Sequence, residues 1–146
     1  LTTTNGTRAI TKVTDAKEVI LASFINITAI SDYIAALGQE VIIICAGTLG
    51  RFSTDDILVA GALICELHNK RVNLELDDLG LAAEFMYKNN KNDLHGILSN
   101  TAHYSRLMEL GLHDDLKYCL NLDTAPMVPI YSEGVVRAWY NIADIR

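Results

Sequence analysis

The sequence of 146 residues lacks a long apolar run, an excess of basic residues and the cysteine pattern of a disulfide framework. No apolar stretch reaches the roughly 18 residues that a membrane-spanning helix needs, so no membrane partner is expected. With 12 Lys and Arg against 18 Asp and Glu, the net charge is −6, and no basic stripe indicates a nucleic-acid partner. The three cysteines are an odd set without metal-ligand spacing, which favours a reducing, cytoplasmic location.

One stretch, residues 40–67, organises the rest of the chain. Residues 41–45 form a short apolar run rich in β-branched side chains, which predicts a buried parallel strand. Two glycines, a threonine and an arginine in residues 46–52 indicate a tight loop. Ser53 and Asp56 have the spacing of a helix start, and an apolar helix follows. A strand, a glycine-rich loop and a helix N-terminus in this order direct backbone N–H groups toward an anion.

Short apolar runs alternate with helical segments through the first half of the chain. A strand end in residues 1–4, a turn in 5–7 and a helix in 8–13 precede a strand in 19–23 and a helix that starts at Asn26 or Thr28, runs through Ala36 and stops at Gly38. The strand at 41–45 and a helix over 54–68 continue the alternation. This order predicts βαβ units and a three-layer α/β/α fold with a mainly parallel or mixed sheet. Gly61 in the middle of the last helix costs about 1 kcal/mol relative to alanine, so close packing is expected there.

The second half of the sequence is mostly helical and ends in a hairpin. The predicted helices cover residues 77–88, 94–98, 101–110 and 114–120. Residues 127–131 and 135–139 flank the turn sequence Ser-Glu-Gly and predict a C-terminal β-hairpin, with Pro129 placing its first strand at a sheet edge. Because there is no internal repeat or low-complexity linker, residues 1–146 are predicted to form a single α/β domain.

Cys45 and Arg51 enclose five residues, which is similar to the Cys-x5-Arg phosphate loop of cysteine-dependent phosphatases. In such a loop, backbone N–H groups and the arginine hold the phosphate, and the same electrostatic field lowers the thiol pKa. Ile44 stands where that loop usually carries a histidine. The preferred interpretation is that Cys45 ends the buried strand as a small apolar residue, because free cysteine is among the most buried residue types.

Two further sets of residues are candidates for metal or anion binding. The adjacent carboxylates of Asp55 and Asp56 could hold Mg²⁺, or could only favour the positive end of the helix dipole. Adjacent helical residues point about 100° apart, so only one of the two is expected to face the loop. Residues 5–8, Asn-Gly-Thr-Arg, could form a backbone nest for phosphate or sulfonate, or an ordinary turn and cap. His103 lies on an apolar helix, where a structural role is the default.

Several motifs together resemble the 2-phosphosulfolactate phosphatase family of coenzyme M biosynthesis. They are Thr3-Thr4-Asn5-Gly6-Thr7-Arg8-Ala9, Ser23-Phe24 with Asn26, Cys45-Ala46-Gly47 with Gly50, Ser53, Asp55, Asp56, Ala60 and Gly61, the pair His103 and Arg106, and Val128-Pro129. The sequence departs from the family pattern at Leu49, where an acidic residue is common, and at Tyr104, which replaces a glycine. Family members also carry an N-terminal region that is absent here, so this chain is expected to be the C-terminal part of a longer protein.

The resemblance implies a Mg²⁺-dependent phosphatase that acts on a small phosphorylated sulfonate, with Asp55 and Asp56 as catalytic, metal-linked carboxylates. The substrate-binding residues that it implies are Asn5, Gly6, Thr7, Arg8, Gly47, Thr48, Gly50, Arg51 and Ser53. One alternative is a cysteine-dependent phosphatase in which Cys45 is the nucleophile and Arg51 is the phosphate clamp. Another is a non-catalytic module for anion binding or oligomerisation, and a homo-oligomer is possible in any of these cases.

Overall fold

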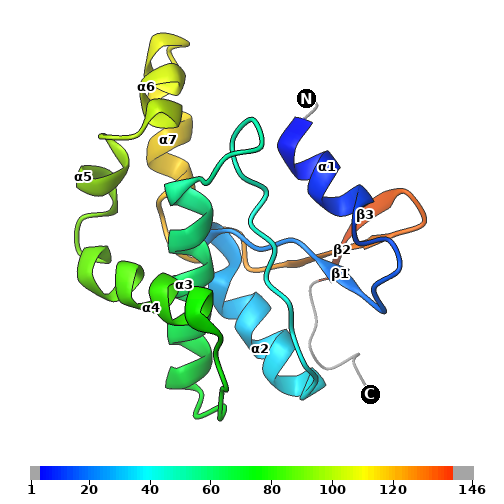
Figure 1. The fold of residues 1–146 in the computed structure, drawn as a ribbon. Helices are drawn as coiled ribbons and strands as arrows, with labels where there is room; N and C mark the ends of the chain where they lie inside the picture. Colours follow the sequence, from blue (N-terminus) through cyan, green and yellow to red (C-terminus); the bar gives the residue numbers. More distant parts are fainter. Residues whose placement is uncertain (1–3, 140–146) are drawn as a thin grey trace.

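The computed structural model describes residues 4–139, which form seven α-helices, one 3-10 helix and three β-strands (Figure 1). In chain order the elements are α1 (Thr4–Thr11), β1 (Val19–Ile20), η1 (Phe24–Asn26), α2 (Ile27–Leu37), α3 (Thr54–Asn69), α4 (Asp78–Asn90), α5 (Leu94–Leu98), α6 (Ala102–Glu109), α7 (His113–Cys119), β2 (Val128–Ser132) and β3 (Val135–Trp139). Among these described helices, none combines the length and the apolar character that crossing a bilayer requires.

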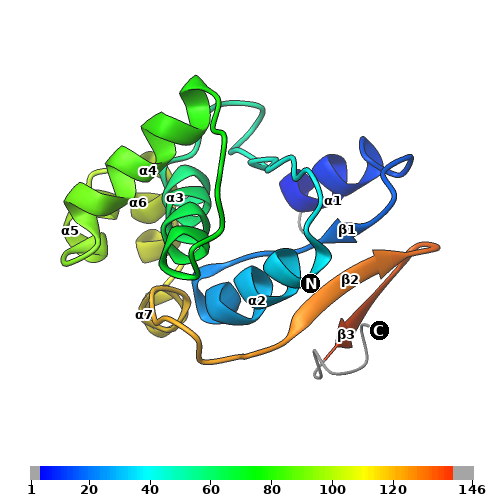
Figure 2. The ribbon, with the colours of Figure 1, turned by 90° about the horizontal axis from the view of Figure 1, so that it is seen from below.

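Helix α3 is the centre of the packing, with α2 on one side and α4 on the other (Figures 1 and 2). Its bounds agree with the predicted helix over residues 54–68, and its apolar side chains are buried nearly all round, with Leu58 fully enclosed. The main core lies between α2, α3, the C-terminal part of α4 and the segments that follow it. Its largest members are Phe24, Ile27, Ile30, Tyr33, Ile34, Leu58, Leu63, Leu67, Tyr87, Leu94, Leu98 and Val128.

Gly61 allows α4 to approach α3 closely, as the sequence predicted. A Cβ atom placed on Gly61 would lie 2.1 Å from the carbonyl oxygen of Ala83 and 2.7 Å from the Cβ of Tyr87. The prediction for α2 is also confirmed. Asn26 is its N-cap, and Gly38 ends it in the left-handed region with φ of +58° and an N–H that donates to the carbonyl of Ile34.

The sheet is antiparallel, with the strand order β1-β2-β3, so the prediction of a mainly parallel or mixed sheet is wrong for the described residues. The three-layer arrangement is likewise not confirmed. The structure does confirm a protein of mixed helices and strands with a C-terminal hairpin. Glu133 and Gly134 make the hairpin turn with φ of +51° and +82°, the backbone sign that a two-residue type I′ turn needs. Pro129 lies in the central strand β2, not at an edge as predicted. It is accommodated because β1 pairs only with residues 130 and 131, and Pro129 offers its carbonyl to the N–H of Leu21.

Residues 41–45 are not the buried parallel strand that the sequence predicted. They run as extended chain between α2 and α3, outside every strand of the described structure, and their side chains are exposed. The physical reason is that a strand needs hydrogen-bonding neighbours, and the residues described here supply none to this run.

The N-terminal prediction also needs correction. The expected turn at residues 5–7 is the first turn of α1, which begins at Thr4, four residues before the predicted start of the helix. The strand end expected in residues 1–4 falls mostly on residues 1–3, which lie outside the described residues, and Thr4 is helical.

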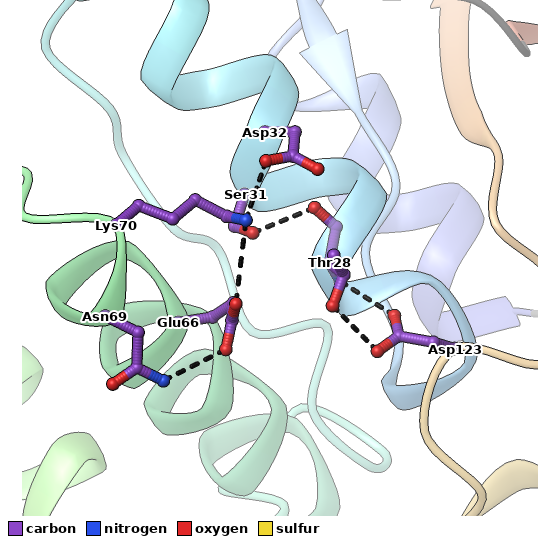
Figure 3. A network of polar contacts seen from close by, with 7 residues as sticks. All are labelled: Thr28, Ser31, Asp32, Glu66, Asn69, Lys70 and Asp123. Carbon is purple, nitrogen blue, oxygen red and sulfur yellow. Dashed lines mark hydrogen bonds and ion pairs between the residues drawn. The ribbon is translucent and has the colours of Figure 1, made fainter.

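Polar contacts hold α2 against α3 and against the segment after α7 (Figure 3). The ammonium of Lys70, just after α3, lies 2.6 Å from a carboxylate oxygen of Asp32 on α2 and 3.6 Å from one of Glu66. Asp123 closes the start of α2, because its two carboxylate oxygens accept from the backbone N–H of Thr28 at 2.8 Å and from the Thr28 hydroxyl at 2.7 Å. These contacts orient α2 and α3 and therefore position the loop between them.

Candidate functional site

The loop of residues 46–52 leads into the start of α3 and contains a tight turn. The N–H of Thr48 donates to the carbonyl of Arg51 at 3.0 Å, and the N–H of Arg51 donates back to Thr48 at 3.0 Å. The two residues between them, Leu49 and Gly50, have φ of +53° and +76°. A left-handed leucine costs roughly 1–2 kcal/mol, so the turn is held in this form by its surroundings.

Gly47 is a position that only glycine can occupy in this conformation. Its φ is +71°, and a Cβ atom there would lie 2.5 Å from the carbonyl oxygen of Arg51. Its N–H donates to a carboxylate oxygen of Asp56 at 2.5 Å. The close approach therefore brings the backbone of the loop against the acidic first turn of α3.

The acidic residues at the start of α3 have different partners. Asp56 binds the loop backbone through Gly47, whereas Asp55 accepts a short hydrogen bond from the hydroxyl of Ser53. The buried Ser53 hydroxyl is also 2.9 Å from the hydroxyl of Thr48. The helix starts where the Ser-x-x-acid spacing predicted, but Ser53 makes no side-chain cap hydrogen bond, because its hydroxyl serves Asp55 and Thr48. As expected, only one of the two aspartates, Asp56, hydrogen bonds to the loop of residues 46–52.

The first turn of α1 meets this loop, although 44 positions separate the two residues in contact. The side-chain oxygen of Asn5 accepts from the N–H of Leu49 at 3.3 Å. Gly6, Thr7 and Arg8 belong to the same helical segment, and the side chain of Arg8 is exposed. The structure thus brings together the two groups of residues that the sequence singled out as anion-binding junctions, and Figure 1 shows the N-terminus of α1 beside the loop.

Four backbone N–H groups of the loop already have acceptors within the protein. Those of Gly47 and Leu49 donate to side chains, and those of Thr48 and Arg51 donate to each other's carbonyls. An oxyanion that binds the N–H group of Gly47 or Leu49 would have to replace Asp56 or Asn5. The side chain of Arg51 is exposed, so its guanidinium can bind an anion without displacing one of these acceptors.

Burial raises the pKa of the Asp56 carboxyl above its ordinary value. The hydrogen bond from Gly47 acts in the opposite direction, the negative charge of Asp55 raises the pKa further, and the imidazole of His103 lowers it. His103 lies on α6, so this helix also contributes to the electrostatics of the carboxylate. The sequence around His103 favoured a structural role, and the only indication of a role near Asp56 was its place in the family motif with Arg106.

The environment of Cys45 does not favour a nucleophilic thiolate. The residue is exposed, but partial burial of its thiol raises the pKa, and the charges of Asp56 and Asp55 raise it further. A reactive cysteine needs the opposite environment, with positive charge nearby. The interpretation of Cys45 as a buried strand end is also wrong, because residue 45 is neither buried nor in a strand.

Asp55 and Asp56 have the donor chemistry that Mg²⁺ uses. The hydrogen bonds described above engage one oxygen of each carboxylate, and a divalent cation would relieve the repulsion that the charge of Asp55 exerts on Asp56. Mg²⁺ is commonly held by one or two carboxylates plus waters and phosphate oxygens. Over residues 4–139 no group of three or more His, Cys, Asp and Glu side chains is arranged to hold a metal, so these two aspartates would need water or substrate to complete a shell.

The fold and this site define a class of protein with mixed helices and strands, in which two adjacent carboxylates at a helix start lie next to a glycine-containing turn. The chain belongs to the 2-phosphosulpholactate phosphatase family, whose model matches residues 1–134, and the resemblance drawn from the sequence is thereby confirmed. It is 46% identical over 136 residues to the probable 2-phosphosulfolactate phosphatase of Caldanaerobacter subterraneus subsp. tengcongensis. The matched residues make up 93% of this chain and 56% of the relative.

Two further relatives carry the same name. The protein from Clostridium acetobutylicum is 39% identical over 136 residues, with 93% of this chain and 57% of the relative covered. The protein from Clostridium novyi is 41% identical over 130 residues, with 88% of this chain and 54% of the relative covered. The chain therefore spans little more than half the length of these curated relatives.

Proposed function

We propose that the protein hydrolyses a small phosphorylated sulfonate, 2-phosphosulfolactate, to sulfolactate and phosphate, as a Mg²⁺-dependent phosphatase of coenzyme M biosynthesis. Family membership supports the reaction type, because the relatives are named for it. The observation that carries the proposal is a pair of neighbouring hydrogen bonds, one between Gly47 and Asp56 and the other between Leu49 and Asn5. Together they bring the carboxylates, the glycine turn and the start of α1 into one place.

In this proposal the carboxylates of Asp55 and Asp56 hold Mg²⁺, which when bound would neutralise phosphoryl oxygens and favour attack by water. Arg51 binds oxygens of the phosphate through its exposed guanidinium. The turn and the helix start are shaped by Gly47, Thr48, Gly50 and Ser53. The second anion-binding segment consists of Asn5, Gly6, Thr7 and Arg8. The reaction breaks the ester P–O bond, and water supplies a hydroxyl to phosphorus and a proton to the leaving alkoxide.

The proposal is tested by measuring phosphate release from 2-phosphosulfolactate with Mg²⁺ and after chelation. We expect release that requires the metal and falls by at least about 100-fold in a double variant with Asp55→Asn and Asp56→Asn, since loss of a metal or electrostatic contact commonly has this size. The matched control changes the acidic pair in the first turn of α7, with Asp114→Asn and Asp115→Asn. This pair has the same helical position away from the glycine turn, so the control variant should retain activity.

Titration of each variant with Mg²⁺ by calorimetry gives a second readout that does not depend on turnover. Loss of Mg²⁺ binding in the Asp55 and Asp56 variant, with retention in the control, supports the assignment of the carboxylates. Phosphate release that survives chelation and disappears in Cys45→Ser would refute it in favour of the thiol. Tight binding of the substrate without any release would instead identify a non-catalytic module.

A further inference from the structure

Residues 41–45 form an extended, apolar segment without a strand partner in the part of the chain that the structure describes. The exposed fractions of Val41, Ile42, Ile43 and Ile44 are 43%, 82%, 40% and 50%. Side chains alternate between the two faces of an extended chain, so apolar groups are exposed on both faces. A solvated loop does not need this composition, and exposed apolar groups of this kind mark a surface that another segment covers.

The pattern identifies what kind of segment would cover it. A continuous β-branched run without alternation is typical of a strand that is paired at its edges and covered on both faces. A helix docked on one face would leave the other face and the backbone N–H and C=O groups exposed. A neighbouring β-strand satisfies the backbone groups and extends the apolar surface on both sides.

We propose that residues 41–45 are a strand of a larger sheet, and that the neighbouring strand comes from the region of the family protein that lies outside this chain. More than two-fifths of each relative's length lies outside the matched part, which is ample for several strands. Pairing with a second copy of this chain is disfavoured, because it would bring together two chains that each carry a net charge of −6.

This pairing has a consequence for the candidate site. The carboxyl end of the run leads directly into the loop of residues 46–52, and the N–H of Gly47, two residues beyond the run, binds Asp56. In open, mostly parallel α/β sheets, the arrangement that a continuous apolar strand favours, ligands bind beyond the carboxyl ends of the strands. The outside region would therefore order the loop and place its own residues next to Asp56.

The experiment mixes this chain with a second polypeptide, the part of the Caldanaerobacter relative that lies outside the matched 136 residues. Calorimetry measures binding, and hydrogen exchange measures protection of the backbone amides of residues 41–45. We expect a complex and slowing of exchange in this segment by at least about tenfold, as for amides that become hydrogen bonded in a sheet. Neither readout depends on catalysis, so the result is separate from the phosphatase proposal.

The discriminating variant is Ile42→Lys, matched by Phe85→Lys as a control. Both side chains are highly exposed, 82% and 69%, so neither change should unfold the chain alone. Figures 1 and 2 show α4, which carries Phe85, on the other side of α3 from residues 41–45. We expect Ile42→Lys to weaken the complex by about tenfold or more, the equivalent of roughly 1.4 kcal/mol, and Phe85→Lys to leave it unchanged.

Three results would overturn the inference. They are the absence of a complex, an equal loss of affinity in both variants, and protection of residues 41–45 that rises with the concentration of this chain alone. The last result would show that the segment pairs with a second copy.

Discussion

Replacing Gly61 with alanine tests the packing that holds α3, and with it the acidic helix start, in place. The new Cβ would lie 2.1 Å from the carbonyl oxygen of Ala83, where ordinary contacts begin at 3.4 Å, so the overlap exceeds 1 Å. The opposing atom belongs to the backbone of α4, so it cannot rotate away, and α4 must shift. Overpacking of this kind costs roughly 1–3 kcal/mol, and occasionally more, while alanine regains about 1 kcal/mol of helix propensity. Because the overlap is large, we expect a net loss near the upper end, about 2 kcal/mol.

Thermal unfolding followed by circular dichroism measures this loss. For a chain of this length a change of about 2 kcal/mol lowers Tm by roughly 4–8 °C. The matched control is Gly80→Ala in the first turn of α4, where a Cβ would meet its nearest neighbours at 3.3 Å. We expect the control to stay within about 1 kcal/mol of the wild type. A Gly61→Ala variant as stable as the wild type would refute the close approach of α4 to α3.

Two further predictions follow from the same structure. Burial raises the pKa of Asp56 in the folded state, so ionisation of this carboxyl opposes folding. The stability that the protonated carboxyl contributes is fully present below the unfolded-state pKa and is lost as pH rises through the folded-state pKa. The free energy of unfolding of the wild type should therefore fall relative to Asp56→Asn as pH increases over that window in urea titrations, and parallel curves would contradict the burial of this carboxylate. Asp123→Ala removes the acceptor for the N–H and hydroxyl of Thr28 and should cost about 1 kcal/mol, as for loss of a helix cap. Asp114→Ala, at a fully exposed position, is the control for that melt and should not change Tm.

Helices α2 and α3 could be predicted from the sequence because their signals are local. Gly38 ends α2 through its own left-handed backbone, and the apolar run after Ser53 begins α3 where the spacing indicated. The hairpin was predictable for the same reason, since Glu133 and Gly134 form its turn within two residues. The family was recognisable because its motifs are short and keep their order along the chain.

The strands and the site depended on partners that are distant in the sequence. Residues 41–45 have the composition of a buried strand, yet composition cannot supply neighbouring backbone groups, and the described chain leaves them exposed. Pro129 indicated an edge strand, but its strand β2 is central because β1 pairs with one side of it and β3 with the other, and the short β1 leaves the proline tolerated there.

In the candidate site, the sequence by itself placed Asp55, Asp56 and the glycine loop next to one another, because fewer than ten residues separate them. The tertiary structure decided which aspartate binds the loop, brought Asn5 to Leu49 across 44 positions and placed His103 where its imidazole lowers the pKa of Asp56. A hydrogen bond or a charge interaction acts over a few ångströms of space, and only the packing of α1, α3 and α6 determines which side chains share that space.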